Sequence, residues 1–362
     1  MTAGESSEST SACSLASWGV VRAGLARFTV LVMLSPADGL TGELVAEWLA
    51  QGWGLACSRV DYVPMGAGSQ NWSVVLADGT RRFIKAEPIG SSSEFFATTY
   101  ATAAALGDAG LDFVVAPIRD RDGEPRRRVS PEWEMAVFPF VEGRNSTSAP
   151  EDRVLVGETI GRLHAGAVVP PIVVRWEPGW YQPELRRLLA KDLDRRWDGG
   201  PFGERARSLL RSDRDGIVRL LDLSDRRVEQ MSTADDAWVM THGEPNRGNT
   251  MIDVSGRAVL IDCNAMMLAP RERDLRVLLY GHRGGRRPDA DRVLAAYQRT
   301  AGSVPLPEFM MELFLAEWHL IEIGRYAERF AGRHDDSDDV RAQWEALTGY
   351  VPVNQNWPLL AR

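Results

Sequence analysis

The chain has few cysteines, and the three present are not grouped. Cys13, Cys57 and Cys263 are far apart in the 362-residue sequence and match no metal-ligand spacing. A structural zinc site and a disulfide framework are therefore not indicated. We expect a cytoplasmic protein whose cysteines stay reduced.

The sequence also lacks a hydrophobic run long enough to cross a bilayer. The apolar segment at residues 30–34 is much shorter than the roughly 20 residues that a membrane-spanning helix needs. It has neither the basic flank nor the small-residue cleavage site of a signal peptide. We expect no membrane partner, and we interpret residues 1–32 as a disordered or dispensable extension.

An excess of positive charge is missing as well. Lys and Arg number 42 against 50 Asp and Glu, a formal charge of −8, and the basic residues are scattered among acidic ones. Nucleic acid is therefore not an expected partner. The length exceeds the roughly 250 to 300 residues at which a single core stops growing, so two lobes are expected.

The most informative segment reads Thr-His-Gly-Glu-Pro-Asn-Arg-Gly-Asn, residues 241–249. Glu244 and Asn249 are five residues apart, and residues 250–261 form two short apolar runs around Ser255-Gly256. This pattern predicts a β-hairpin that returns Asp262 to the side of Asn249. Phosphoryl transfer requires oxygen ligands for a metal and a carboxylate that orients the attacking hydroxyl, and these residues can supply both.

Upstream, the order of segments predicts a small β-sheet. A strand over residues 60–65 leads to a Gly-containing loop at residues 66–71, a strand at 72–76, an Asp-Gly turn and a strand ending at Lys85. Residues 111–117 and 134–143 read as two further strands. In the loop, Gly66 and Gly68 allow the backbone to approach phosphates, and Ser69 can donate a hydrogen bond to them.

In order and spacing these segments resemble the aminoglycoside phosphotransferase family, the branch of the protein-kinase-like fold that phosphorylates small molecules such as antibiotics. HGEPNRGN occupies the place of the family's His-Gly-Asp-x-x-x-x-Asn, and LIDCN that of its metal-binding Asp. Residues 269–275 resemble the segment that follows. The resemblance implies an α+β bilobal fold, with a small antiparallel β-sheet in a nucleotide-binding lobe (33–141). A mostly helical lobe (142–362) would carry the catalytic and acceptor-binding residues.

The same resemblance implies the cofactors and the site. ATP or GTP is the expected phosphoryl donor with Mg²⁺ as the metal. Glu244 is the expected catalytic carboxylate, supported by His242 and, through further hydrogen bonds to the loop, by Asp274. The nucleotide is expected on Lys85, Gly66, Gly68, Ser69 and the backbone near Phe138, Phe140 and Val141, and the metal on Asn249 and Asp262.

Two positions are left open by the pattern. The family's Lys usually pairs with a Glu on the next helix, and Glu94 is the only carboxylate offered there. It follows Lys85 closely, so it is equally well explained as a residue that favours a helix N-terminus. His164, in a Gly-Arg-Leu-His element, is expected to be a buried structural residue.

The acceptor is less well defined. Residues 172–235 form a helical insertion expected to shape its pocket, and residues 308–330 form a long helix. On that helix Trp318, Glu322 and Tyr326 recur every four residues and share a face, which is either a core stripe or an acceptor-binding face. A hydroxylated antibiotic of the aminoglycoside, aminocyclitol, nucleoside or peptide type is the expected acceptor.

Two alternatives remain. A metabolic kinase acting on a sugar or an amino alcohol would carry the same catalytic residues. A catalytically weak nucleotide-binding regulator is the other alternative, because Glu244 stands where most of the family has Asp.

Overall fold

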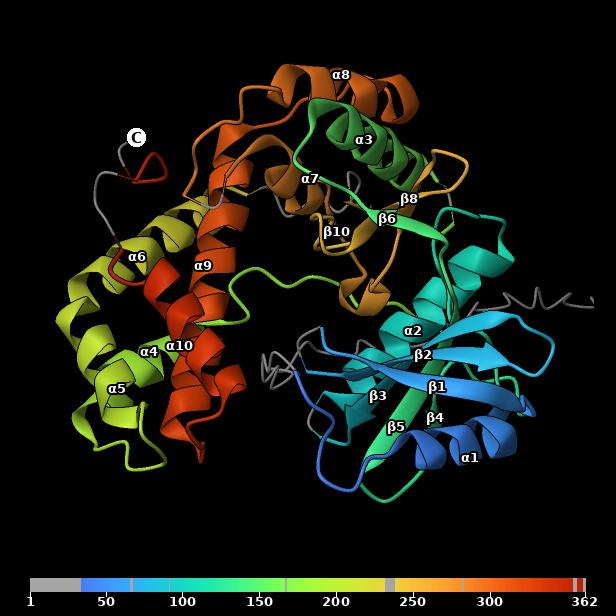
Figure 1. Cartoon of the computed structure of the whole chain (residues 1–362). Helices are drawn as coiled ribbons and strands as arrows, with labels where there is room; N and C mark the ends of the chain where they lie inside the picture. Colours follow the sequence, from blue (N-terminus) through green and yellow to red (C-terminus); the bar gives the residue numbers. More distant parts are fainter. Residues whose placement is uncertain are drawn as a thin grey trace, which may run out of the picture.

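The computed structural model describes residues 34–65, 68–90, 92–166, 168–231, 238–281, 283–353 and 357–360. The extension predicted at residues 1–32 and the phosphate-loop residue Gly66 lie outside the described residues. The fold is α+β, as predicted, with a small antiparallel sheet beside a mainly helical region (Figure 1).

The small lobe is a five-stranded antiparallel sheet with a helix on each face. Successive strand residues point to opposite faces, so Ile84 packs towards the first helix while Phe83 packs towards the second. The strand order is β1 (Cys57–Val63), β2 (Gln70–Leu76), β3 (Arg81–Pro88), β5 (Trp133–Pro139) and β4 (Arg127–Arg128), and the helices are α1 (Gly42–Trp53) and α2 (Ser93–Asp108).

Helix α1 covers the outer face of this sheet. It begins after Thr41, whose hydroxyl accepts a hydrogen bond from the Leu44 amide, and ends at Gly54, which adopts φ +70°. A side-chain cap and a left-handed glycine are the usual signals for the two ends of a helix. Val45 and Leu49 are fully buried against the sheet.

The segment 111–117 is not a strand of the small sheet, contrary to the sequence prediction. It is a connection from α2 whose Val115 amide donates to the Leu260 carbonyl (2.9 Å), while the Leu260 amide donates to Phe113 (2.7 Å). Phe113 and Val114 are buried in the core of the larger lobe. The apolar side chains of this segment are therefore buried at the junction between the lobes.

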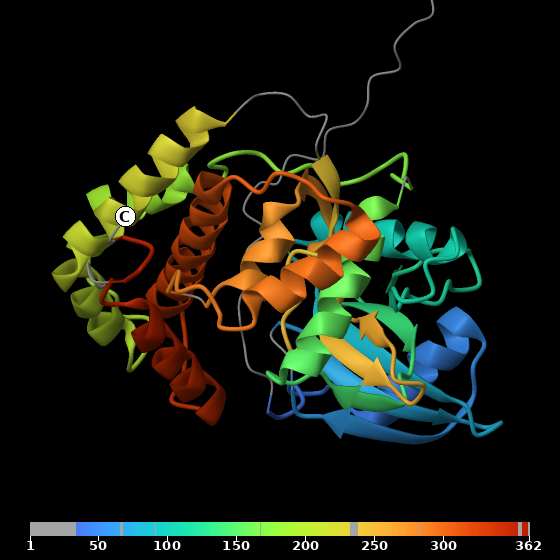
Figure 2. The same ribbon diagram turned by 90° about the horizontal axis from the view of Figure 1, so that it is seen from above.

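The larger lobe is built around helix α9 (Glu308–Ala331), which packs against α4, α5, α6, α7 and α10. Figure 2 shows α9 between the α4–α6 group and the α7–α8 pair. Helix α3 packs closely on α8. The elements are β6 (Gly143–Asn145), α3 (Pro150–Ala165), α4 (Gln182–Ala190), η1 (Asp192–Asp194), α5 (Gly203–Ser212), α6 (Arg214–Gln230), β7 (Trp238–Thr241), β8 (Thr250–Asp253), β9 (Ala258–Leu260), η3 (Cys263–Ala265), β10 (Met267–Pro270), α7 (Glu272–Leu279), α8 (Ala290–Ala301), α9 and α10 (Asp338–Tyr350).

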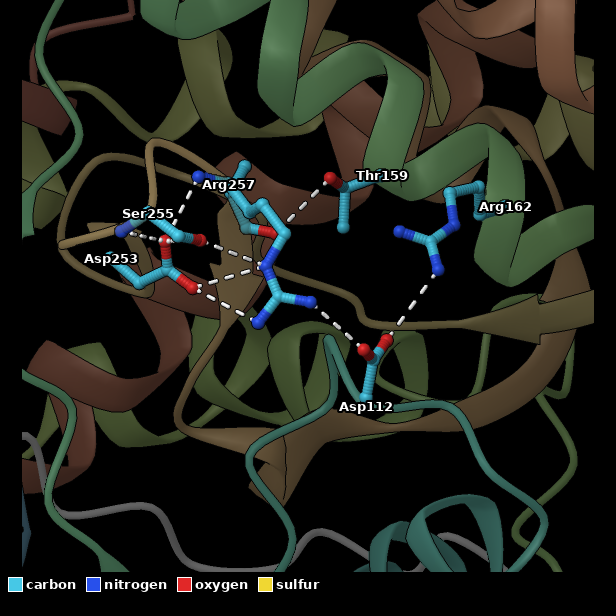
Figure 3. A network of polar contacts seen from close by, with 7 residues as sticks. Asp112, Thr159, Arg162, Asp253, Ser255 and Arg257 are labelled. Atoms are coloured by element: carbon cyan, nitrogen blue, oxygen red, sulfur yellow. Dashed lines mark hydrogen bonds and ion pairs between the residues drawn. The ribbon is translucent and has the colours of Figure 1, made fainter.

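The predicted hairpin is present as β8 and β9, and its turn is tied to neighbouring elements (Figure 3). Asp253 accepts hydrogen bonds from the Ser255 amide (2.9 Å) and the Arg257 amide (3.0 Å). Arg257 also forms an ion pair with Asp112 (2.9 Å), which Arg162 of α3 approaches at 3.5 Å. These contacts fix the hairpin that precedes Asp262.

Candidate active site

A cavity of about 1110 Å³ is lined by residues from both lobes. Its wall draws on β3, β5, α2, the loop after β7, α7 and α9. Nine of the site residues predicted from the sequence line it, namely Gly68, Lys85, Phe138, Phe140, Val141, Glu244, Asn249, Asp262 and Trp318.

An ion pair between Lys85 and Asp262 lies in this cavity. The Lys85 side chain is 9% exposed and that of Asp262 is 31% exposed. Asp262 adopts φ 59° and ψ 56°, the left-handed region that costs a non-glycine residue roughly 1–2 kcal/mol. The Ile261 amide donates to the Asn249 carbonyl (3.0 Å), so the chain returns beside Asn249 as predicted.

The loop that carries Glu244 is held by one buried carboxylate. Asp274 accepts hydrogen bonds from the amides of His242 (2.8 Å) and Gly243 (2.6 Å) and is contacted by His164 Nε2 (3.1 Å). Burial alone would raise the pKa of Asp274, but the His164 contact and nearby positive charge hold it below its ordinary value. Asp274 therefore holds the Glu244 loop through two backbone hydrogen bonds, in agreement with the support that the resemblance implied.

His242 supports the loop and does not reach the cavity. It is fully buried, and its Nε2 contacts the Ile261 carbonyl at 2.9 Å. The next residue, Gly243, has φ +96°, and a Cβ there would come within 2.5 Å of the Arg273 guanidinium. From this position His242 holds the Glu244 loop and the end of the hairpin together.

Glu244 faces the cavity. Its carbonyl accepts a hydrogen bond from the Asn249 side chain (3.1 Å), which closes the loop between these two residues. Burial raises the pKa of the Glu244 carboxyl, and Arg325 and Arg276 act in the opposite direction. A carboxylate with a raised pKa beside an open cavity is suited to accepting a proton from a bound hydroxyl.

The end of the cavity at which the nucleotide is predicted to bind is formed by β3, β5 and the described part of the loop between β1 and β2. Phe138, Phe140 and Val141 line it on one side, and Gly68, with φ +82°, lines it on the other. Ser69 differs from the prediction, since it is 4% exposed and its hydroxyl donates to the Asn71 side chain (3.0 Å). Its hydrogen bond therefore stabilises the loop from within.

A second carboxylate, not predicted from the sequence, lies beside Lys85. Glu87 is two residues further along β3, lines the same cavity and is 2% exposed. Tyr100 of α2 donates a hydrogen bond to it (2.8 Å), and Arg126 forms an ion pair with it (3.1 Å). Burial raises the pKa of Glu87, against the opposing effect of Arg126 and Lys85. Glu94, the candidate from the sequence, is exposed.

Helix α9 presents a different stripe to the cavity from the one predicted. Glu317, Ile321 and Arg325 line the cavity, together with Trp318. Glu322 and Tyr326 are not among the lining residues; Glu322 forms an ion pair with Arg325, and Tyr326 belongs to the hydrophobic core. The two stripes are one residue, about 100°, apart on the helix, and a four-residue period alone does not distinguish them.

The end of the cavity beside α7 and α9, where the acceptor is predicted to bind, also contains polar residues that were not predicted from the sequence. The Trp176 indole donates to both carboxylate oxygens of Glu317 (3.1 and 3.0 Å). Burial raises the pKa of Glu317 to about 7. Arg273 and Arg276 of α7 line the same region, and Arg276 stacks 4.7 Å from the Trp318 ring. The signal that could have revealed Glu317 is a carboxylate inside an otherwise apolar helical stretch.

A model of the phosphotransferase enzyme family (APH) matches residues 60–313. This span includes Lys85, the Glu244 loop and Asp262, which the structure brings to one cavity. The chain belongs to this family.

The relatives of this phosphotransferase agree with that assignment. Protein StrN of Streptomyces griseus is 28% identical over 281 residues, which are 71% of this chain and 77% of StrN. The structure of spectinomycin phosphotransferase APH(9)-Ia with ADP and spectinomycin has a TM-score of 0.69 and 16% identity, and covers 88% of this chain and 97% of that one. Amicoumacin kinase hAmiN with AMP-PNP and Ca²⁺ has a TM-score of 0.58 and 13% identity, and covers 88% and 95%. At these identities the structures show a shared fold.

The phosphotransferase offers oxygen ligands of the kind that Mg²⁺ prefers. Asn249 and Asp262 are adjacent at the cavity wall, and no group of three His, Cys, Asp or Glu side chains forms a metal cluster in the described part of the chain. This donor set fits Mg²⁺, which is usually bound by one or two protein ligands while phosphates and water complete its shell. Cys263, next to Asp262, is fully buried, and burial raises the pKa of its thiol to about 12.

Within the described residues, no helix combines the length and apolarity needed to cross a bilayer. Cys57 and Cys263 are both free thiols.

Proposed function

We propose that this phosphotransferase transfers the γ-phosphoryl group of ATP or GTP to a hydroxyl of a small molecule, and that the acceptor is a hydroxylated antibiotic. The observation that carries the proposal is the meeting of Lys85, Asp262, Asn249 and Glu244 at one cavity that both lobes line. The family supports phosphoryl transfer. A resistance or self-protection role follows if the acceptor is an antibiotic.

Each residue of the site has a separate role in the proposed reaction. Glu244 orients the acceptor hydroxyl and takes its proton as the new oxygen–phosphorus bond forms and the bond from the γ-phosphorus to the bridging oxygen breaks, releasing the nucleoside diphosphate. When the nucleotide binds, the Lys85 ammonium leaves the Asp262 carboxylate and contacts the nucleotide phosphates. Asn249 and Asp262 would hold Mg²⁺, which would neutralise charge on the phosphate oxygens. Phe138, Phe140 and Val141 form the purine side of the cavity.

The antibiotic class is supported by similarity of fold to spectinomycin phosphotransferase and amicoumacin kinase. A cytosolic location is supported by the free thiols of Cys57 and Cys263, since a reducing compartment is where such thiols persist. Two alternatives were predicted. The acceptors that are phosphorylated distinguish a metabolic kinase from this proposal, and measurable turnover distinguishes a weak regulator from it.

The test is a phosphoryl-transfer assay on the purified full chain with ATP or GTP and Mg²⁺. Hydroxylated antibiotics, sugars and amino alcohols are offered, and mass spectrometry detects the gain of one phosphoryl group. Asp262→Asn serves as the inactive control. A phosphorylated antibiotic supports the proposal, and a phosphorylated sugar or amino alcohol alone indicates the metabolic kinase. Nucleotide binding without transfer to any acceptor would contradict catalysis.

A further inference from the structure

A second, smaller cavity lies beside the loop that carries Glu244. Its volume is about 300 Å³, at the lower limit of the size range of small-molecule sites. Its wall combines the connection between β6 and α3, helix α3, the Glu244 loop, the start of β8, α7 and the segment between α7 and α8. None of these parts has a role in the proposed reaction except the Glu244 loop.

The Glu244 loop separates the two cavities. Glu244 and Asn249 line the larger cavity. Arg247 and Thr250 line the smaller one, and Asn246 lines both. The Asn246 carbonyl accepts hydrogen bonds from the Asn249 amide (3.0 Å) and the Thr250 hydroxyl (2.9 Å). A ligand in the smaller cavity therefore contacts this loop without entering the space predicted for nucleotide and acceptor.

The smaller cavity is lined by positive charge. Three arginines and no Asp or Glu of the described part of the chain line it. Arg153 comes from α3, Arg247 from the Glu244 loop, and Arg287 from the segment between α7 and α8. This lining contrasts with the formal charge of −8 for the whole chain. A concave surface with charge of one sign attracts ions of the other sign, so the cavity favours an anion.

The three guanidinium groups are only partly neutralised by the protein. Arg153 forms an ion pair with Asp289, and its side chain is 12% exposed. Arg287 donates through Nε to the Tyr280 carbonyl (2.9 Å). Among the described residues, no ion pair or hydrogen-bond partner is found for the Arg247 guanidinium or for the terminal nitrogens of Arg287. These nitrogens are donors available to a ligand.

Arg153 and Arg287 also affect each other. Burial and the positive charge of Arg153 lower the pKa of Arg287, against the opposing effect of Asp289. A bound anion would reduce this repulsion. Asp152, which accepts a hydrogen bond from the lining residue Thr147 (2.8 Å), is itself paired with Arg144. Its charge is therefore offset outside the cavity.

The donors in this cavity suit phosphate oxygens. A guanidinium group presents a planar fork of N–H donors that matches phosphate and can bind two of its oxygens at once. Ser148 lines the cavity and is exposed, so its hydroxyl can add a further donor. Two guanidinium groups without ion pairs match a dianion better than a singly charged carboxylate.

We propose that the smaller cavity is an anion-binding site for a dianionic phosphate group, carried either by inorganic phosphate or by a small phosphate monoester. Arg247 and Arg287 hold the phosphate oxygens, and Arg153 adds positive charge to the wall. The site is separate from the cavity of the proposed reaction, and the inference does not depend on the identity of the acceptor.

The test is isothermal titration calorimetry of the full chain with inorganic phosphate and, separately, with glycerol 3-phosphate. A non-hydrolysable ATP analogue and Mg²⁺ are present throughout, so that the larger cavity is already occupied. Sodium chloride keeps the ionic strength constant, because screening would otherwise change during the titration. We expect one saturable site per chain. Tighter binding of inorganic phosphate identifies free phosphate as the ligand, and tighter binding of glycerol 3-phosphate identifies a monoester.

Arg247→Gln and Arg287→Gln should each raise the Kd for phosphate by about tenfold or more, the scale of one charge-assisted hydrogen bond. Arg247 is exposed, so its replacement is expected to leave the fold intact even if Arg287→Gln does not fold. Arg226→Gln is the matched control. Arg226 is an exposed arginine on α6 that lines neither cavity, and its replacement should leave the Kd unchanged.

The outcomes separate this inference from the proposed function. Saturable binding that weakens in a cavity variant and not in Arg226→Gln supports the site. Absence of saturable binding at tens of millimolar phosphate overturns it. Equal affinity in both cavity variants and wild type also overturns it, as does an equal loss in Arg226→Gln. All of these readouts measure binding, so failure of phosphoryl transfer to every acceptor would overturn the proposed function and leave the site standing.

Discussion

Lys85 and Asp262 form an ion pair across 177 residues of sequence. Lys85 comes from the central part of the small sheet, and Asp262 follows the last strand of the hairpin in the larger lobe. The pair thus joins the two lobes at the cavity. If Asp262 binds Mg²⁺, as we propose, the Lys85 ammonium and the metal ion compete for its carboxylate, and binding of nucleotide with Mg²⁺ is expected to exchange one for the other.

Asp262→Asn should reduce turnover by about 100-fold or more while changing the melting temperature little. Asn tolerates the left-handed backbone that Asp262 adopts, so the variant removes charge without the strain that Ala would add. Initial rates at several Mg²⁺ concentrations and a thermal melt measure the two effects. If Asp262→Asn turns over at the wild-type rate, Asp262 is not a metal ligand.

Glu244→Gln should lower kcat by about 100-fold with nucleotide affinity nearly unchanged, because a general base contributes on this scale. Since burial raises the pKa of Glu244, the wild-type rate should fall as the pH drops through that raised pKa, so the acid limb lies above the ordinary pKa of a glutamate carboxyl. Rates of wild type and Glu244→Asp are measured as a function of pH. The nucleotide affinity of Glu244→Gln is measured by titration and compared with that of wild type. An acid limb at the ordinary carboxyl pKa would argue against this assignment.

Glu87→Gln should raise KM for the nucleotide by about tenfold, the scale of one charge-assisted hydrogen bond. Glu87 lies beside Lys85 on the same strand face, and its carboxyl would remain next to the Lys85 ammonium if Asp262 bound a metal ion. Glu94→Gln is the control, since Glu94 is exposed, and it should leave KM unchanged. Equal effects of the two variants would show that Glu87 does not position Lys85.

Glu317→Gln should become more stable relative to wild type as the pH rises from about 4.5 to 7. The folded-state pKa of Glu317 is raised from 4.5 to about 7, so the folded protein holds this proton more tightly than the unfolded chain. The stability contribution is therefore complete below pH 4.5 and is lost as the pH passes 7, by on the order of 2–3 kcal/mol.

Gln keeps an oxygen that can accept the Trp176 hydrogen bond but has no proton to lose. Thermal or denaturant unfolding of both proteins at pH 4.5, 6 and 8 measures the difference. A stability difference that does not vary with pH would contradict a raised Glu317 pKa.

The parts of the site that are local in sequence were predictable. Glu244, Asn249 and Asp262 are placed by one loop and one hairpin, whose turn residues and strand pattern fix their separation. Lys85 was found for the same reason, since it lies on the strand that follows an Asp-Gly turn. The support of the loop by Asp274 came from the resemblance, and the two backbone hydrogen bonds agree with it.

Other features depend on how separate elements pack. Residues 111–117 have the apolar pattern of a strand, yet they form the connection between the lobes. An apolar pattern alone does not show which part of the protein will bury the side chains. Glu94 and Glu87 are both close to Lys85 in sequence, and only the strand alternation and the position of Tyr100 on α2 place Glu87 beside it.

The sequence by itself determined the hairpin that follows the Glu244 loop, because it arises from local turn chemistry and strand patterns. It determined the α+β fold through the resemblance of its segments to a known family. Only the tertiary structure decided the acceptor end. The rotation of α9 selects Glu317, Ile321 and Arg325 in place of Glu322 and Tyr326 for the cavity wall. Burial and charge neighbours then set the properties of Glu317 and Arg276. Helical periodicity gives a face, but the packing of the other helices decides which face meets the cavity.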